Sequence, residues 1–253
     1  MNKLYYTDSS RFITYNNYKS NKKNMPTVIF LHGLMSSMAS TKAVYIANYC
    51  KIHDYNFITF DNLGHGESSG KFVEGTIGSW LSAVELVLNN LIEENCIIIG
   101  SSKGGWLALL AALKFSAKIY ALICLAPAVD FTEENIWRNL TAQQKLKMQH
   151  DGWLDIKSKF CDHKYTISYK LIAEARNHLL LGENIIKLDI PIHLIHSMAD
   201  LDVPYNVSIK LMEKISSNKV VLKLIKDGGH SLSRPQDLEI ISHSLEEIIK
   251  LEK

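Results

Sequence analysis

Short apolar segments rich in β-branched residues alternate along the chain with longer amphipathic segments. This alternation is typical of a parallel β-sheet flanked by helices. The short segments are almost continuously apolar, which favours strands that are covered on both faces. Strands are expected at 27–32, 56–61, 96–100, 119–126, 192–196 and 220–225, and helices at about 38–50, 76–94, 104–115, 205–216 and 235–251. The pattern therefore predicts an α/β fold with a mostly parallel, doubly wound sheet.

Two parts of the chain depart from this alternation. The first residues contain LYY and FITY separated by DSSR, which predicts a β-hairpin at one edge of the sheet. Residues 130–189 are rich in Lys, Asn, Gln and His, and they indicate helices at 141–150 and 168–180 but no obvious strand. We therefore expect one domain over 1–253, with a small helical cap at 130–189 inserted after the sixth strand.

Composition and charge narrow the classes of partner. The chain has 253 residues, of which 47% are hydrophobic, and a net charge of +2. This near balance argues against a nucleic-acid partner, which needs a concentrated basic face. The four cysteines form no C-x-x-C pair, which predicts a reducing compartment. With no apolar signal core and no segment of membrane-spanning length, a cytoplasmic, soluble protein is expected. The sequence does not indicate its oligomeric state.

A candidate nucleophile lies where the third apolar segment ends. The run GSSKG, from Gly100 to Gly104, matches the G-x-S-x-G nucleophile elbow with Ser102 in the central position. Such an elbow reverses the chain sharply, strains the nucleophile's backbone and leaves no room for side chains at the two glycines. Ser101, in the variable position, is the weaker candidate. A glycine-rich turn with no catalytic role could have the same sequence, so the case for a nucleophile depends on other residues.

A serine hydroxyl needs a base to take its proton and an acid to orient that base. In this architecture the chain order is serine, acid, histidine. Asp200 follows the strand at 192–196, and His230 follows the last strand. Because both come just after the carboxyl ends of strands, where open α/β sheets place their sites, we expect them to meet Ser102.

Several other residues compete for these roles. Asp202 is the alternative acid, less favoured because the turn favours the first Asp after the strand. His193 and His196 lie in or at the end of a strand, where packing and a local hydrogen bond are the expected roles. No histidines show a metal-ligand spacing with a carboxylate, so neither a metal nor another cofactor is expected.

The negative charge that develops on the substrate oxygen needs fixed donors. The backbone N–H groups of Lys103, which starts a helix, and of Leu34, in the loop after 27–32, are the expected oxyanion hole. His32 and Gly33 are candidate substrate-binding residues, although a plain strand-ending turn would also use them. The Lys103 ammonium either lies near the pocket and favours substrates with a carboxylate, or leaves the pocket and pairs with a nearby acid.

The cap holds two large aromatic side chains. Trp137 and Trp153 could line an acyl pocket, although side chains at such spacing also pack a cap onto a sheet. We take both as candidate substrate-binding residues.

Five runs together resemble the α/β-hydrolase superfamily: His32-Gly33, DNLGHGES at 61–68, GSSKGG at 100–105, DLDVP at 200–204, and Gly229-His230. MASTKA at 38–43, TIGSW at 76–80 and GSSKGGW at 100–106 further resemble the mitochondrial abhydrolase-domain enzymes that remove palmitoyl groups from protein cysteines and hydrolyse acyl glucuronides. The resemblance implies ester or thioester hydrolysis by Ser102, Asp200 and His230, with 130–189 as the cap over the acyl pocket. That group usually has an apolar residue where this chain has Lys103.

The leading hypothesis is therefore a cofactor-free serine hydrolase that acts on a small-molecule or acylated-protein ester or thioester. Its activity should fall on acidification, because a protonated His230 cannot act as a base. A peptidase or C–C bond hydrolase with the same three residues is the alternative, because a fold does not fix its chemistry. A non-catalytic binding protein with the same fold is the second alternative.

Overall fold

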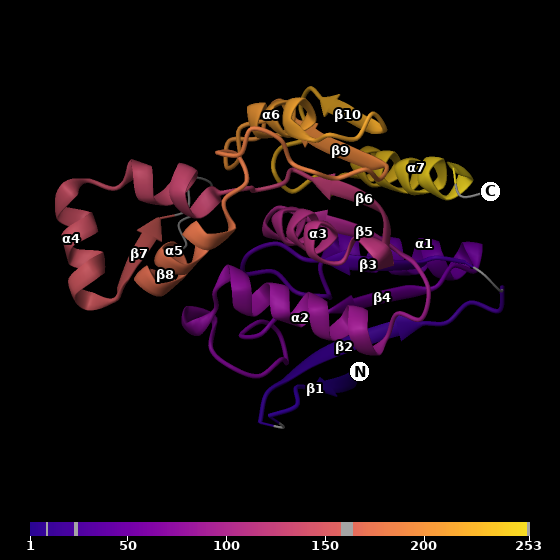
Figure 1. Ribbon diagram of the computed structural model, residues 1–253, viewed down its shortest axis with the longest axis horizontal. Helices are drawn as coiled ribbons and strands as arrows, with labels where there is room; N and C mark the ends of the chain where they lie inside the picture. Colours follow the sequence, from indigo (N-terminus) through magenta and orange to yellow (C-terminus); the bar gives the residue numbers. More distant parts are fainter. Residues whose placement is uncertain (9, 23–24, 158–163, 252–253) are drawn as a thin grey trace.

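An eight-stranded β-sheet crosses the computed structural model, which describes residues 1–8, 10–22, 25–157 and 164–251 (Figure 1). Its strands pair antiparallel at the β1–β2–β4 edge and parallel elsewhere. The predicted edge hairpin and all six predicted strands are confirmed. Across the sheet the order is β1 (Asn2–Tyr5), β2 (Phe12–Tyr18), β4 (Phe57–Phe60), β3 (Thr27–Leu31), β5 (Cys96–Ser101), β6 (Ile119–Leu125), β9 (Ile192–Ser197) and β10 (Val220–Ile225).

Helices cover both faces of this sheet. One core cluster joins the sheet to α2 (Ile77–Asn90), α3 (Lys103–Lys114) and α6 (Asn206–Lys214). The other joins the opposite face to α1 (Thr41–His53) and α7 (Pro235–Leu251). The doubly wound arrangement and its five helices are thus confirmed. Among the described residues, no helix combines the length and the apolar character needed to cross a bilayer.

The chain between β6 and β9 leaves the sheet and forms a separate lobe at the left of Figure 1. It contains α4 (Ala142–Asp151), β7 (Trp153–Lys157), β8 (Lys164–Ser168) and α5 (Tyr169–Ala175). The two predicted helices are present, but the expectation that this segment has no strand was wrong. β7 and β8 form an antiparallel hairpin in which the buried Leu154 and Ile167 are partners. Both side chains belong to the core cluster on the α2–α3 face, so the lobe shares that core.

The chain turns sharply from β5, which ends at Ser101, into α3, which begins at Lys103. Ser102 has φ 54° and ψ −118°, a backbone conformation that is costly for any residue but glycine. A Cβ atom at Gly100 would overlap the carbonyl of Gly104, and one at Gly104 would overlap the carbonyl of Leu31. The two glycines therefore allow β5, α3 and the end of β3 to meet closely around Ser102.

The substitution Gly104→Ala tests this close approach. Since the new methyl group would overlap main-chain atoms that cannot move aside, we expect a loss of about 3 kcal/mol or more in the free energy of unfolding, measured by urea denaturation. Gly182→Ala is the matched control, because a Cβ there has no atom within 4 Å; it should change the stability by no more than about 0.5 kcal/mol. Equal stability of the two variants would contradict this account of the elbow.

Candidate active site

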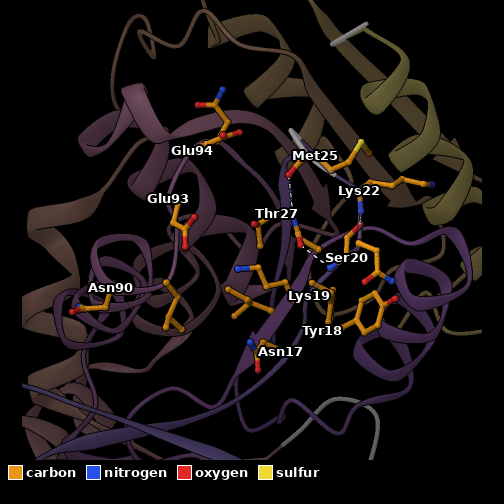
Figure 2. A pocket seen from close by; sticks show the side chains of 16 residues that line it. Asn17, Tyr18, Lys19, Ser20, Lys22, Met25, Thr27, Asn90, Glu93 and Glu94 are labelled. Carbon is orange, nitrogen blue, oxygen red and sulfur yellow. Dashed lines mark hydrogen bonds between the residues drawn. The ribbon is translucent and has the colours of Figure 1, made fainter.

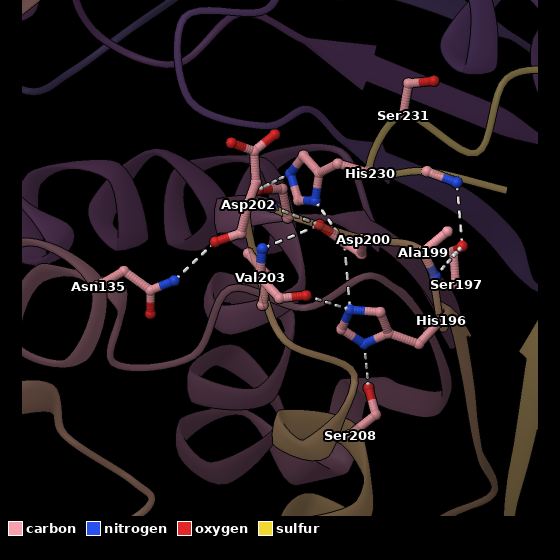
Figure 3. Close-up of polar contacts among 12 residues, drawn as sticks. Asn135, His196, Ser197, Ala199, Asp200, Asp202, Val203, Ser208, His230 and Ser231 are labelled. Carbon is pink, nitrogen blue, oxygen red and sulfur yellow. Dashed lines mark hydrogen bonds and ion pairs between the residues drawn. The ribbon is translucent and has the colours of Figure 1, made fainter. Parts of the chain in front are cut away.

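Three side chains from distant parts of the sequence meet at the carboxyl ends of the parallel strands. Ser102 follows β5, Asp200 follows β9 and His230 follows β10. His230 Nε2 lies 3.0 Å from Ser102 Oγ. On the other side of the ring, His230 Nδ1 lies 2.7 Å from Asp200 Oδ2 (Figure 3). The structure thus brings together the three residues that the sequence analysis selected.

The chemistry of the partners sets the proton positions. An ionised Asp200 carboxylate can only accept hydrogen bonds, so His230 Nδ1 carries the hydrogen and donates it to Oδ2. His230 Nε2 is then the acceptor, and the Ser102 hydroxyl donates to it. This is the arrangement from which a serine can pass its proton to an imidazole.

The Asp200 carboxylate is buried but has hydrogen-bond donors on both oxygens. The backbone N–H groups of Asp202 and Val203 each donate to Oδ1 over 2.9 Å. Oδ2 lies 2.7 Å from His230 Nδ1 and 3.2 Å from His196 Nε2. Burial acts to raise the pKa of Asp200, but the hydrogen bonds from His196, His230 and the Val203 amide, together with attraction to His230, hold it well below its usual range.

Asp202, the alternative acid, lies beside this carboxylate. Its backbone N–H donates to Asp200, and its carbonyl accepts a 2.7 Å hydrogen bond from Asn135 Nδ2 in the lobe between β6 and β9. It is the Asp200 carboxylate that contacts His230 Nδ1. Asn135 therefore joins that lobe to the loop that holds Asp200 (Figure 3).

The two expected oxyanion donors lie next to Ser102. Lys103 is the first residue of α3, directly after Ser102. Gly33 approaches Ser102 so closely that a Cβ there would lie 3.4 Å from Ser102 Cβ. Leu34, the next residue, lines the same cavity as Ser102. Among the described residues, neither the Leu34 nor the Lys103 backbone N–H has an acceptor. Both amides are thus available to an incoming oxygen.

A cavity of about 150 Å³ holds Ser102 and His230. Its wall combines apolar surface with polar groups from serine side chains and from Lys42. The lining residues are Phe30, His32, Gly33, Leu34, Ser36, Ser40, Lys42, Ser101, Ser102, His230 and Ser231. His32 and Gly33 thus line the cavity, and their role in substrate binding stays a prediction.

His32 contributes to this wall as a buried, hydrogen-bonded ring. Its Nδ1 donates to the Gly33 carbonyl over 2.8 Å, and its Nε2 accepts from the Asn62 amide over 3.1 Å. Burial, and then the nearby Lys103 and His65, hold the pKa of His32 well below its ordinary value. A neutral ring with both nitrogens engaged fixes the loop rather than binding substrate by its polar atoms.

The structure does not bring Trp137 or Trp153 into this cavity, so their prediction as substrate-binding residues finds no support there. Trp137 packs on Tyr169, with the Arg176 guanidinium 5.1 Å from its ring centroid. Trp153 lies on β7 and is 49% exposed. Trp137 thus packs within the lobe and against the core cluster on the α2–α3 face.

Lys42 is a residue of the cavity to which the sequence alone gives no role. Its ammonium donates to the carbonyl oxygen of Ser231, next to His230, and lies 3.5 Å from Ser233 Oγ. Burial lowers the pKa of Lys42 to about 8, although Asp237 acts to raise it. Since Lys42 and Ser231 are 189 residues apart in sequence, no local pattern could have indicated this contact.

The Lys103 side chain takes neither of the two expected positions. It is completely buried, and its Nζ lies 4.2 Å from the Trp80 ring centroid without any hydrogen-bond partner among the described residues. Burial holds the pKa of Lys103 well below its ordinary value, with Asp61 acting weakly in the opposite direction. Lys103 therefore neither lines the cavity nor forms an ion pair. Its backbone is at the site and its side chain is in the core.

Among the described residues, Asp200, Asp202 and His230 are the group whose ligand atoms come close enough for a metal ion, within 4.8 Å. Both oxygens of Asp200 and both nitrogens of His230 already take part in hydrogen bonds. These residues therefore do not present a free set of metal ligands.

A larger hollow, of about 500 Å³, lies at the other end of the sheet (Figure 2). Residues at or just before the starts of β3, β4 and β5 line it, among them Thr27, Asn56 and Asn95. It contains none of the predicted site residues. Its size therefore does not make it the reaction site.

The buried amine of Lys103 predicts a pH-dependent cost in stability. The folded protein favours the neutral amine, whereas the unfolded chain holds the proton up to about pH 10. The unfolded state thus binds more protons below that pH, so the penalty shrinks as pH rises. We expect Lys103→Met to be more stable than wild type by about 1–3 kcal/mol at pH 7, with the gap narrowing towards pH 9.5 in urea unfolding series.

The control is Lys210→Met, on an exposed position of α6. The difference in unfolding free energy between this variant and wild type should not depend on pH. A Lys103→Met protein that is less stable than wild type by the same amount at every pH would contradict the buried-amine account.

Comparisons with known proteins place the chain in a family. The profile of the Hydrolase_4 family, described as serine aminopeptidase, S33, matches residues 22–166. The chain is 33% identical to the human palmitoyl-protein thioesterase ABHD10, mitochondrial, over 233 residues, which cover 92% of this chain and 76% of that protein. The structure of mouse alpha/beta hydrolase domain-containing protein 10 matches with a TM-score of 0.91 and 30% identity, covering 100% of this chain and 99% of the other. A putative hydrolase from Agrobacterium vitis S4 matches with a TM-score of 0.92 and 31% identity, covering 98% and 97%. The chain therefore belongs to the Hydrolase_4 family of α/β hydrolases, and it is a hydrolytic enzyme.

Proposed function

We propose that this protein hydrolyses carboxylic esters or acyl thioesters through an acyl-enzyme on Ser102. The observation that carries the proposal is the series of contacts from Asp200 through His230 to the Ser102 hydroxyl. The similarity to proteins named palmitoyl-protein thioesterase supports the ester and thioester class. This chemistry requires no cofactor.

The reaction follows from the proton positions. His230 Nε2 takes the Ser102 proton as Oγ attacks the acyl carbon, and the resulting imidazolium is stabilised by Asp200. The imidazolium then returns the proton to the leaving alcohol or thiol. Water attacks the acyl-enzyme with His230 again as the base, which releases the acid and restores Ser102.

The oxyanion of each tetrahedral intermediate needs donors at fixed positions. The backbone N–H groups of Leu34 and Lys103 fill this role in our proposal, because both lie beside Ser102 without another acceptor. The Lys103 amide is at the N-terminus of α3, where the helix dipole also favours a negative charge. The positioning of both amides depends on the strained elbow and on Gly33.

The cavity suggests a small group on one side of the scissile carbonyl. Its volume of about 150 Å³ is below the roughly 300–1,000 Å³ typical of sites for larger organic ligands. Ser36 and Ser231 bring hydroxyl groups to its wall, and Lys42 brings a positive charge. We infer that esters with a short or polar group fit this basin better than a long, unbranched acyl chain.

Peptide hydrolysis is the second candidate, favoured by the description of the matching family as serine aminopeptidase. An aminopeptidase has to bind the positively charged amino terminus of its substrate. The cavity beside Ser102 presents the Lys42 ammonium and no carboxylate among its lining residues. Like charges repel, so the cavity favours the ester over the aminopeptidase function.

A panel of substrates tests the proposal. We expect purified protein to hydrolyse p-nitrophenyl and acyl-thioester substrates, with kcat/KM higher for acetyl and butyryl groups than for palmitoyl, and to be slow on aminoacyl p-nitroanilides. Ser102→Ala should lower kcat by about 10³-fold or more, because the nucleophile is lost. A preference for the aminoacyl amides, or full activity in Ser102→Ala, would overturn the proposal.

Fluorophosphonate labelling separates an enzyme from a non-catalytic binding protein. Ser101→Ala is the matched control, since Ser101 is the neighbouring serine and lies on β5. Labelling should persist in Ser101→Ala and disappear in Ser102→Ala. An unlabelled folded wild type would favour the binding protein.

A cytoplasmic location remains our proposal for this chain. Cys50, Cys96 and Cys124 are free and buried, which suits a reducing compartment, while Cys161 lies outside the described residues. Fractionation of the native cell, followed by immunoblotting, tests the location.

A further inference from the structure

A second imidazole contacts the carboxylate of the proposed catalytic site. His196 lies near the end of β9, and its side chain is completely buried. Its Nε2 lies 3.2 Å from Asp200 Oδ2, the same oxygen that accepts from His230 (Figure 3). The proposed reaction uses His230 but assigns nothing to His196.

The partners of His196 define which nitrogen carries its hydrogen. Nε2 lies 3.0 Å from the carbonyl oxygen of Val203, which can only accept, so Nε2–H is the donor. The same N–H faces Asp200 Oδ2, so the two oxygens share it. At the other side of the ring, Nδ1 lies 2.8 Å from Ser208 Oγ, and in the neutral ring it accepts from that hydroxyl. Ser208 lies on α6 and is completely buried.

This arrangement leaves the Asp200 carboxylate little freedom to rotate. Two backbone amides hold Oδ1, and two imidazoles face Oδ2. If His196 were absent, Oδ2 would have His230 as its remaining donor among these contacts. The carboxylate could then turn about its Cβ–Cγ bond and carry His230 away from the geometry in which Nε2 meets Ser102.

We propose that His196 is a positioning residue for the hydrolytic reaction: it holds Asp200 Oδ2 in line with His230 and shares the charge of that oxygen. The inference rests on the proposed function of Ser102, Asp200 and His230. Ser208 fixes the ring of His196 with its donor towards Asp200. The route from α6 to the nucleophile is thus Ser208, His196, Asp200, His230 and Ser102.

Two substitutions separate this role from simple packing. His196→Phe keeps a ring but removes both nitrogens, whereas His196→Gln keeps an N–H donor at nearly the distance of imidazole Nε2. We expect His196→Phe to lower kcat on a p-nitrophenyl ester by about tenfold, with KM changed by less than about twofold, because the reacting groups lose alignment. His196→Gln should keep kcat within about threefold of wild type.

The pH profile gives a readout that packing alone does not move. Without His196 the charge of Oδ2 acts on His230 alone, which favours the protonated ring. Among the described residues, the titratable groups near the His196 ring include Asp200, which it contacts. Asp202 and His230 lie beside the Asp200 carboxylate. We expect the acid limb of kcat/KM to move up by about 0.5 pH unit in His196→Phe and to stay in place in His196→Gln.

His193→Phe is the matched control, since it also replaces a buried histidine of β9 but one that has no contact with Asp200 among the described residues. It should leave kcat and the acid limb unchanged. Wild-type kcat in His196→Phe would overturn the inference, as would equal losses in His196→Phe and His196→Gln with an unmoved acid limb. If Ser102→Ala kept full activity, the proposed function itself would fail instead.

Ser208→Ala covers the case in which His196→Phe does not fold, as judged by circular dichroism. Without the hydroxyl, the ring of His196 is no longer fixed with its donor towards Asp200. We expect kcat to fall by about threefold and the acid limb to move up, in the same direction as in His196→Phe. An unmoved acid limb and wild-type kcat in Ser208→Ala would overturn the inference.

Discussion

The hydrogen bonding of one buried carboxylate, that of Asp200, is the interaction on which the site depends. A buried charge is costly unless donors replace the water it has lost. Here the donors are the backbone of the loop after β9 and two imidazoles, one from β9 and one from the loop after β10. The same contacts that make the charge tolerable also hold His230 towards Ser102. The contacts that stabilise the buried Asp200 carboxylate therefore also align the His230 ring.

The sheet supplies the frame for that requirement. Because β5, β6, β9 and β10 are parallel neighbours, the loops that follow them open at one edge. The elbow adds strain at Ser102, which the close packing of Gly100 and Gly104 maintains. Lys42 on α1 and Asn135 in the lobe then tie the His230 loop and the Asp200 loop to the rest of the chain. The site is thus assembled by tertiary contacts around a local strained turn.

Much of the fold and the three central residues could be predicted from the sequence, because each leaves a local signal. Apolar segments mark the strands, and Gly100 to Gly104, Asp200 and His230 each follow one. The β7–β8 hairpin could not be predicted, since its alternation is short and its charged residues resemble those of the neighbouring helices. The burial of Lys103 and the particular partners of His196 could not be predicted either, because they depend on Trp80, Ser208 and Asp200, which only the folded chain brings near. The cavity wall is likewise a product of distant segments.

We propose that the Asp200 carboxylate, through His230, makes Ser102 a nucleophile. Measuring kcat for Asp200→Asn beside Asp202→Asn, on one ester and with folding checked by circular dichroism, tests it most directly. We expect kcat to fall by about 10³–10⁴-fold in Asp200→Asn, because an amide can stabilise the wrong tautomer of the imidazole. In Asp202→Asn, kcat should change by less than about threefold. Near-wild-type kcat in Asp200→Asn, or the large loss in Asp202→Asn instead, would contradict it.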